Sequence, residues 1–462
     1  MALILSVISG IFLNLAFAPF NFWPAAFVSL GALFLVLSNR GFWKRMLIAF
    51  IFALSFFLLL LHWSGSYVGW FPWISLALLQ AGIFAFIGLI RFERDFLGAI
   101  GFAGWFLFIE LLRMKAPFGG FGWGRIGHTQ TYSLSSLYPI IGIAGISFLV
   151  VLFSALFSLR KWKALSLLVL VASISLIMPA HLRETGKINV LAVQGGVDQL
   201  GLEFNQRALS VLRRHIAATN PKTSNLDLVV WPENASDLDP EKNPIAKNEI
   251  SDLLVRINKP ILVGAVERSN AGPLNVSILY KPDGNKIRYV KQDLAPFGEY
   301  IPLRSLAERI EPTAKRVVDF QPGREPVVFQ LEKDTFATLI CFEILDDDLV
   351  RRSTRGASFL INQTNNATFG KSNQAAQQLQ IASARAAELQ KSLVAVSTTG
   401  FTSYIDSSGR SIATLPQFQP GSLSAEVVTN EGRSLASSLG SFFWFGFGAL
   451  ALGLRRLRYL NR

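Results

Sequence analysis

The sequence has one cysteine, Cys341, and four histidines in 462 residues. A single cysteine excludes an internal disulfide, and the histidines, His62, His128, His181 and His215, are scattered along the chain. Zinc and similar metals are usually held by clusters of cysteine and histidine side chains. The sequence therefore predicts neither a disulfide framework nor a metal site.

Charged residues are also scarce, at 16% of the chain, whereas 51% of the residues are hydrophobic. This balance is too apolar for a soluble protein of this length. Residues 1–180 contain 11 Lys and Arg but only 3 Asp and Glu, separated by long uncharged blocks. Each block is close to the ~20 residues that cross a bilayer as a helix. We therefore predict a multi-pass helical membrane domain with about eight spans, at about 3–18, 22–38, 46–63, 71–90, 96–112, 139–158, 164–180 and 435–454.

Basic residues predict the orientation of these spans. The links after the second, fourth and sixth spans and the tail after the eighth read NRGFWKR, RFERD, RKWK and RRLRYLNR. If the spans alternate, all four lie on one side, and the positive-inside bias makes that side cytoplasmic. Arg113, Lys115 and Arg125 fall in a loop on the other side, where we expect them either to contact lipid head groups or to be solvated.

The region 187–430 differs in composition from residues 1–180, because it is nearly neutral, with 27 Lys and Arg against 26 Asp and Glu. Its β-branched runs, bounded by turn residues, predict strands: INVLAVQ, LDLVVWPE, PILVGAVE, NVSILY, FATLICFE, ASFLINQ and SLVAVSTTG. Helical patterns lie among them, notably NQAAQQLQIASARAAELQK at 373–391. Such alternation indicates an α/β or layered αβ domain with its own core.

Three parts are therefore expected. Residues 1–186 form the seven-span domain, residues 187–430 form an extracytoplasmic domain, and residues 431–462 contain the eighth span and a cytoplasmic basic tail. The net charge of +13 belongs to the membrane part. A nucleic-acid partner is not predicted, because that would need a basic patch on the folded domain.

Three reactive side chains lie at the ends of predicted strands: Glu233 after a strand and a proline in VVWPENA, Lys291 at the end of a strand in YVKQD, and Cys341 at the end of a strand in TFATLICFE. Taken singly, they are typical of a surface glutamate, an exposed lysine and a buried cysteine. Taken together they suit nucleophilic catalysis, because a thiol needs a base and an ammonium can stabilise an oxyanion. His215, on a basic amphipathic helix far from these strand ends, is not expected to take part.

The order WPE, K and CFE resembles the nitrilase superfamily, whose members use a Glu–Lys–Cys triad. The likeness to the apolipoprotein N-acyltransferase family is closer and covers almost the whole chain. It is carried by KQDLAPFGEYIP, the membrane stretch LAFAPFNFWPAAFVSLGAL and the loop GGFGWGRIGHTQ, in the expected order. The resemblance implies an α/β nitrilase-like αββα sandwich. It also implies that Glu233 is the general base, Lys291 the oxyanion partner and Cys341 the nucleophile, with Glu299 and Glu343 as supporting carboxylates.

The resemblance implies a reaction as well. An acyl chain passes from a membrane phospholipid to Cys341 as a thioester, then to the α-amine of a diacylglyceryl-cysteine on an apolipoprotein, without a cofactor. The expected location is the bacterial inner membrane, with the catalytic domain on the periplasmic face. Two other functions stay open: a membrane-tethered nitrilase-type amidohydrolase, which gives no reason for eight spans, and a non-catalytic scaffold or transporter. Charges within spans favour transport, and the clear case is Glu110, with Arg113 one turn later.

Four residues depart from the family pattern. Phe204 lies near a usual tryptophan, and Phe342 replaces a common tyrosine after the nucleophile. In TNNATFG, at 364–370, Asn366 stands in place of an aspartate and Thr368 in place of a tryptophan. These departures leave the triad intact and affect the expected lining of the lipid pocket. The glycine-bracketed loops 118–127 and 296–302 are expected to be either flexible lids or ordinary turns.

Overall fold

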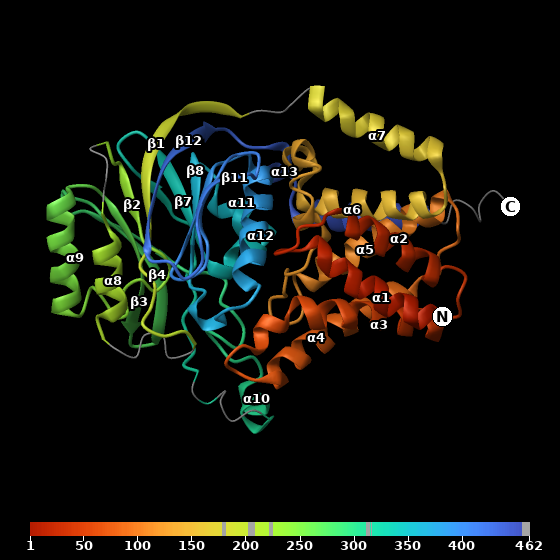
Figure 1. Cartoon of the computed structure of the whole chain (residues 1–462), viewed down its shortest axis with the longest axis horizontal. Helices are drawn as coiled ribbons and strands as arrows, with labels where there is room; N and C mark the ends of the chain where they lie inside the picture. The colour runs from red at the N-terminus through yellow and green to blue at the C-terminus, as the bar shows by residue number, and fades with distance from the viewer. Residues whose placement is uncertain (178–181, 202–207, 221–224, 311–314, 316, 455–462) are drawn as a thin grey trace. The chain divides into compact units, whose positions relative to one another are not determined.

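The computed structural model describes residues 1–177, 182–201, 208–220, 225–310, 315 and 317–454 (Figure 1). Contacts divide the chain into two compact units. Unit 1 consists of Met1–His181, Ser372–Leu389 and Ser434–Arg462, and unit 2 consists of Leu182–Lys371 and Gln390–Arg433. Each unit combines segments that are far apart in the sequence. The three domain bounds expected from the sequence stay a prediction.

Unit 1 is helical, as expected of uncharged apolar runs whose backbone groups must find their hydrogen bonds within the segment. Some helix starts have clear local causes: Asp95 caps α5 by accepting from the Gly98 backbone N–H at 2.8 Å, and α2 and α6 have a proline in their first turn. The helices are α1 (Ala2–Leu13), α2 (Pro24–Leu37), α3 (Phe42–Leu60), α4 (Trp70–Ala85), α5 (Phe96–Arg113), α6 (Tyr138–Ser158), α7 (Trp162–Ile177), α12 (Gln374–Leu389), α13 (Leu435–Ser438) and α14 (Ser441–Leu454).

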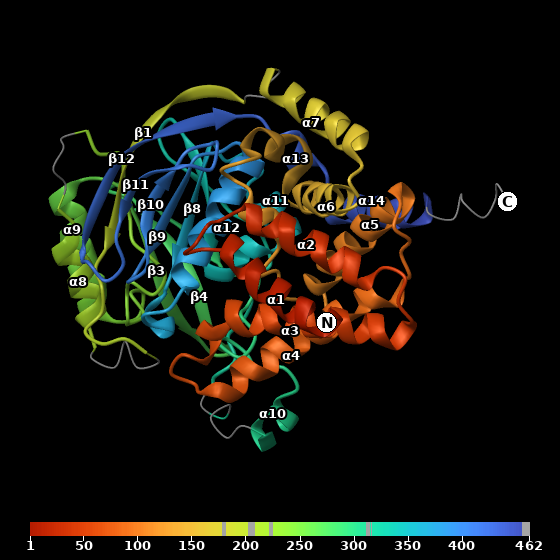
Figure 2. The same cartoon turned by 45° about the vertical axis from the view of Figure 1, so that its right-hand side comes forward.

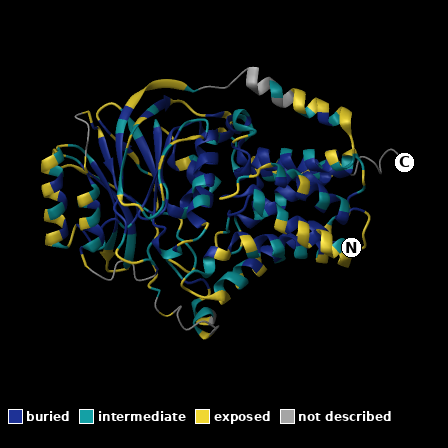
Figure 3. Cartoon of the chain, viewed as in Figure 1, coloured by how far each residue is buried: buried dark blue, intermediate teal, exposed yellow. Residues whose placement is uncertain are grey.

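Within the described ranges, four helical segments are long and apolar enough to cross a membrane: Phe42–Leu60, Trp70–Leu89, Phe96–Arg113 and Ser135–Ser158. Shorter apolar helices occupy Ala2–Ala16, Pro24–Leu37 and Ser441–Leu454. Large apolar side chains such as Ile4, Val28 and Phe442 are exposed on these helices, as expected of surfaces that face lipid. Figure 3 shows exposed positions along the chain in yellow. The count of eight spans stays a prediction. The end of the expected seventh span and the basic tail lie outside the described residues.

The loop that follows α5 contains a correction to the sequence analysis. Arg113 and Arg125 are both 0% exposed, so the expectation that they contact head groups or solvent is wrong for these two residues. Arg113 Nη2 donates to the Trp123 carbonyl at 2.7 Å, and Glu110 Oε1 accepts from the Ile126 backbone N–H at 2.8 Å. Buried charges need polar partners, and the backbone of this glycine-rich loop supplies them. These bonds fix the loop to α5.

Unit 2 contains two six-stranded mixed sheets (Figures 1 and 2). All seven strands expected from β-branched runs are present. In spatial order the first sheet is β12 (Gly421–Glu431), β1 (Arg183–Gln194), β2 (Leu228–Val230), β3 (Ile261–Ser269), β4 (Gly272–Tyr280) and β5 (Lys286–Val290). The second is β11 (Ser411–Leu415), β10 (Thr402–Ile405), β9 (Leu393–Ser397), β8 (Phe359–Thr364), β7 (Thr335–Ile340) and β6 (Val328–Gln330). The pairs β1–β2, β2–β3, β7–β8 and β8–β9 are parallel.

The core of unit 2 lies between the two sheets, where side chains such as Leu262 of β3 and Phe359 of β8 belong to one buried cluster. A second cluster joins the other face of the first sheet to the helices α8 (Ser210–Ala218) and α9 (Pro244–Ile257). The short helices α10 (Arg304–Ile310) and α11 (Asp347–Ser353) complete the unit, and α11 contacts β7. The predicted nitrilase-like pair of sheets with flanking helices is confirmed.

One buried side chain joins the two sheets beside the cavity described below. Gln363 of β8 donates from Nε2 to the Trp231 carbonyl at 2.6 Å, just beyond β2. Its Oε1 accepts from Thr338 Oγ1 of β7 at 3.0 Å and from the Ser277 hydroxyl of β4. Buried polar groups are costly unless they are satisfied, so these bonds define the spacing of the sheets near Glu233.

The helix α12 belongs to unit 1, although the segments on both sides of it in the sequence belong to unit 2. Its buried glutamines provide the contacts. Gln377 Oε1 accepts from Trp63 Nε1 at 3.1 Å and from Trp123 Nε1 at 2.6 Å, and Gln380 Nε2 donates to the Ala16 carbonyl at 3.2 Å. The sequence predicted the helix but not this packing.

Candidate active site

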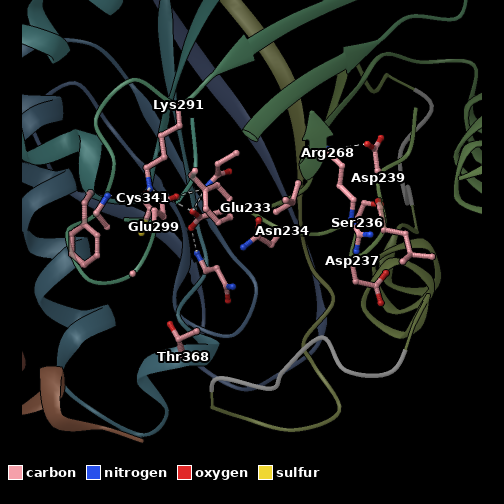
Figure 4. A pocket seen from close by; sticks show the side chains of 18 of the residues that line it. Glu233, Asn234, Ser236, Asp237, Asp239, Arg268, Lys291, Glu299, Cys341 and Thr368 are labelled. Atoms are coloured by element: carbon pink, nitrogen blue, oxygen red, sulfur yellow. Dashed lines mark hydrogen bonds and ion pairs between the residues drawn. The ribbon is translucent and has the colours of Figure 1, made fainter. Parts of the chain in front are cut away.

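The three reactive residues found at predicted strand ends line one cavity of about 590 Å³ in unit 2 (Figure 4). Glu233 lies beyond β2, Lys291 directly follows β5, and Cys341 directly follows β7. Glu299, from the loop after β5, lines the same cavity. The first two strands belong to one sheet and β7 to the other, so the cavity lies where ends of both sheets meet.

Cys341 occupies a strained turn. Strand β7 ends at Ile340, and Cys341 begins a short 3-10 helix. The backbone φ of Cys341 is +55°, in the left-handed region that residues other than glycine rarely adopt. Its side chain is 5% exposed. Such strain persists only where the surroundings fix the backbone, and it is common at reactive residues. Here Asn362 Nδ2 donates to the Leu339 carbonyl at 3.0 Å, one residue before the strand ends.

Glu343 fixes the same turn from within the protein. Its Oε2 accepts from the Ile340 backbone N–H at 2.7 Å, and its Oε1 accepts from Tyr289 Oη at 2.7 Å and from the Gln292 backbone N–H at 2.6 Å. Burial raises the pKa of Glu343 to about 7, against the opposing effect of these donors and of Lys291. The carboxyl group thus ties the Cys341 turn to the chain on both sides of Lys291, an arrangement that suits positioning better than proton transfer.

Lys291 is 1% exposed, so its interpretation as an ordinary surface lysine is wrong. Its Nζ lies 2.7 Å from Glu299 Oε2 and 3.8 Å from Glu233 Oε1. Burial opposes the ammonium charge, but the attraction of Glu299, Glu233 and Cys341 outweighs it and raises the pKa of Lys291. The lysine is therefore a fixed positive charge beside the thiol.

Glu233 is 6% exposed, so the alternative of a surface glutamate is also wrong. Its Oε1 accepts from Asn275 Nδ2 and its Oε2 from the Asn365 backbone N–H, both at 2.8 Å. Burial raises the pKa of Glu233, and Glu299 adds to the rise, while Lys291 and the two donors oppose it. A carboxylate with a raised pKa is better matched to a thiol proton than an exposed one.

This cavity therefore combines a base, a fixed cation and a thiol, the groups needed for acyl transfer through a covalent intermediate. The described ranges hold no group of three or more His, Cys, Asp or Glu side chains placed to hold a metal ion. His215, a histidine of unit 2, is buried in α8, and its Nδ1 bonds to the Val211 carbonyl at 2.8 Å. Burial lowers its pKa to about 4, so it is neutral at physiological pH.

Sequence reasoning missed Asn275 and Asn365, which bond Glu233, because asparagines in or after an apolar strand carry no distinctive signal. Of the residues that depart from the family pattern, Phe342 and Thr368 line the cavity. Asn366 instead has a structural part, because its Oδ1 accepts from Ser397 Oγ at 2.5 Å. Phe204 lies outside the described residues.

Two family models match the chain. Residues 9–156 match the apolipoprotein N-acyltransferase N-terminal domain, and residues 194–436 match the carbon-nitrogen hydrolase model. The chain is 31% identical to an apolipoprotein N-acyltransferase of Mycolicibacterium smegmatis, with 90% of this chain and 78% of that protein covered. It is 29% identical to an apolipoprotein N-acyltransferase of Haemophilus influenzae, with 98% and 94% covered.

Similar solved structures include a CN-hydrolase superfamily protein from Xanthomonas campestris. That chain is 18% identical, with 60% of this chain and 96% of that chain covered and a TM-score of 0.39. Nit3 of Saccharomyces cerevisiae, a member of the nitrilase superfamily, is also 18% identical, with 53% and 91% covered and a TM-score of 0.37.

Proposed function

The chain belongs to the apolipoprotein N-acyltransferase family, and we propose that it transfers an acyl chain from a membrane phospholipid to the N-terminal amine of a diacylated apolipoprotein. The activity is that of an acyltransferase in lipoprotein maturation. The observation that supports this proposal is the cavity in unit 2, which Glu233, Lys291 and Cys341 line together. Their contacts support the roles of base, oxyanion partner and nucleophile in that order.

In the first half-reaction, the Cys341 sulfur attacks the ester carbonyl carbon of the phospholipid, and Glu233 takes the thiol proton. The negative charge that develops on the carbonyl oxygen is stabilised by the Lys291 ammonium, which acts strongly in a buried site. The C–S bond forms, the C–O bond to glycerol breaks, and the proton on Glu233 passes to the departing lysophospholipid oxygen. A thioester on Cys341 remains.

In the second half-reaction, the neutral α-amine of a diacylglyceryl-cysteine attacks the thioester carbonyl. The N–C bond forms and the C–S bond breaks. Glu233 takes a proton from the amine nitrogen and returns it to the Cys341 sulfur. The products are an amide on the lipoprotein and the original thiol, so the enzyme works in a ping-pong cycle without a cofactor.

Both proposed substrates are anchored in a bilayer, which gives the helices of unit 1 a clear purpose. A soluble enzyme of this chemistry would have to extract each substrate from the membrane. The basic links after the second, fourth and sixth predicted spans support a cytoplasmic location for those links. On that basis we place the protein in the bacterial inner membrane, with its catalytic domain on the periplasmic face.

A nitrilase-type amidohydrolase would use the same three residues, but it gives no reason for helices that match the N-terminal domain of the acyltransferases. Transport by a non-catalytic protein is also less supported. The buried Glu110 and Arg113, which made transport worth considering, bond the backbone of a neighbouring loop.

The test is to incubate the purified full chain with a phospholipid labelled in its acyl chain and to search for the acyl group on Cys341 by mass spectrometry. A diacylglyceryl-cysteine peptide is then added. The proposal expects a labelled Cys341 that loses its acyl group to the peptide amine. Absence of label on Cys341, or turnover of small amides with no transfer from phospholipid, would contradict it.

A further inference from the structure

One neutral residue, Asn275, bonds two charged side chains of the cavity and the backbone of a third charged residue. Asn275, on β4, is 2% exposed and lines the cavity. Its Nδ2 donates to Glu233 Oε1 and to Glu299 Oε1, at 2.8 Å in both cases. Its backbone carbonyl accepts from the backbone N–H of Lys291 at 2.9 Å. A single residue thus bonds both carboxylates and also the backbone of the lysine between them.

The charges explain why such a bridge matters. Glu233 and Glu299 are two acids that share one cation, Lys291, in a site with little solvent. Two carboxylates that share a site repel each other, so one of them tends to hold a proton. Protonated Glu233 cannot accept a proton from the thiol. An amide NH₂ group with one hydrogen directed to each carboxylate counters this repulsion and adds no charge of its own.

We propose that Asn275 is a positioning residue that keeps Glu233 ionised and oriented for proton transfer, by bridging it to Glu299. This inference rests on the proposed acyl-transfer function, in which Glu233 is the base. Asn275 exchanges no proton and forms no covalent bond in either half-reaction. It acts through Glu233, and the orientation of its amide is fixed because a flipped Oδ1 would face two anions.

The titratable groups that face Glu233 are few. Lys291 and Glu299 come from the segment after β5, and Cys341 directly follows β7. Of the further charged residues that line the cavity, Asp237, Asp239 and Arg268 lie away from this group (Figure 4). Lys242 also lines the cavity. Of these groups, Glu299 alone shares the Asn275 amide with Glu233. Removal of the amide therefore acts on the acid side of the pH profile, through these two carboxylates.

The test is the rate of thioester formation on Cys341 from a labelled phospholipid, measured with the full chain in detergent at pH 6 and pH 9. In Asn275→Ala both donors are lost, so the pKa of Glu233 rises and its ionised fraction at low pH falls. We expect the rate to fall about tenfold further at pH 6 than at pH 9. Asn275→Ser keeps one donor, so its loss at pH 6 should be intermediate.

Tyr280→Phe is the matched control, because Tyr280 is a buried residue five positions along the same strand whose hydroxyl donates to Glu241, a carboxylate outside the set that lines the cavity. It should lower the unfolding temperature but leave the ratio of the two rates unchanged. An unchanged ratio in Asn275→Ala would overturn the proposal, and if that variant does not fold, an unchanged ratio in Asn275→Ser would do so. A native chain that forms no thioester at either pH would contradict the proposed function itself.

Discussion

Lys291 Nζ lies 2.7 Å from Glu299 Oε2, and the two side chains are 1% and 12% exposed. This pair is eight residues apart in the sequence and is held together by a turn in which the Glu299 backbone N–H donates to the Ala295 carbonyl at 2.9 Å. Glu299 is therefore the nearer counter-ion of the lysine, and Glu233, at 3.8 Å, remains available to the thiol.

The first prediction concerns this pair. Glu299→Gln removes the nearer counter-ion, so Lys291 should move toward Glu233 and hold it as an ion pair. A lost charged hydrogen bond of about 1.5–3 kcal/mol corresponds to a fall of roughly 10–100-fold in the rate of thioester formation. Glu241→Gln is the control. Glu241 pairs with Lys286 at the solvent-exposed start of β5, the strand that ends just before Lys291. That variant should keep the native rate.

The second prediction concerns the form of the positive charge. Lys291→Met should lower the rate of thioester formation by roughly 10²–10³, the usual effect of losing one oxyanion donor. Lys291→Arg should recover little of it, because a planar guanidinium is larger than the ammonium and the position is fully enclosed. Rates are compared by single-turnover labelling. Near-native turnover in Lys291→Arg would show that a diffuse charge is sufficient.

The third prediction concerns the nucleophile and its base. Cys341→Ala should form no acyl-enzyme, and Cys341→Ser should react poorly because a hydroxyl is a weaker nucleophile. Glu233→Gln keeps the size of the side chain and one oxygen that can accept from Asn275 or Asn365. Its amide cannot accept a proton from the thiol, so the variant should fold and form little thioester. The amount of acyl label on each variant is measured after gel separation. If Glu233→Gln acylates at the native rate, the base is another carboxylate, and Glu299 becomes the first to test.

The fourth prediction is a pH dependence of stability. The pKa of Glu343 is raised by burial from the model-compound value of 4.5 to about 7. A raised pKa means that the folded state favours the protonated form. The stabilisation is therefore complete below pH 4.5 and is lost as the pH rises to about 7, a change of roughly 3 kcal/mol in the free energy of unfolding.

Thermal unfolding measured from pH 5 to pH 8 checks this expectation. The native midpoint should fall as the pH rises. Glu343→Gln should unfold at a lower temperature overall, since one donor near Ile340 or Gln292 loses its acceptor, but its midpoint should depend less on pH. The surface carboxylate Glu249, which pairs with Arg213, provides the control. Glu249→Gln should keep the native slope.

The fifth prediction concerns orientation in the membrane. A reporter that is active only outside the cytoplasm should be active when fused after residue 186 and silent when fused at residues 42 and 162. The physical reason is the excess of Lys and Arg in the links near 42 and 162. Activity at residue 42 would reverse the proposed orientation and place the catalytic domain on the cytoplasmic side.

Local patterns were sufficient for much of the fold and the site. The strands around Cys341, Glu233 and Lys291 were predictable because β-branched runs end there at polar residues. The meeting of these three residues followed only from the family resemblance, since strand order in two separate sheets leaves no periodic signal. Asn275 lies within a strand that reads as apolar, and its importance depends on two carboxylates 42 residues before it and 24 residues after it.

The membrane part was harder to predict in detail. The apolar runs indicated spans, but Arg113 was expected at the surface because a charge in a loop is usually solvated. Its burial depends on backbone carbonyls of a glycine-rich loop, whose path the sequence does not reveal. The helix at 374–389 was predicted from its periodicity, yet its partners are aromatic and backbone groups more than 200 residues earlier.

The position of that helix in the chain has a consequence for biosynthesis. Unit 1 includes Ser372–Leu389, which the ribosome makes after Leu182–Lys371, the larger of the two segments of unit 2. Until then Trp63 and Trp123 lack the Gln377 oxygen that accepts from both of their indole N–H groups. The early helices of unit 1 therefore stay incompletely packed until α12 has been synthesised. Chains that end before residue 372 should be recognised by membrane proteases as unfinished, even when all of their early helices are inserted.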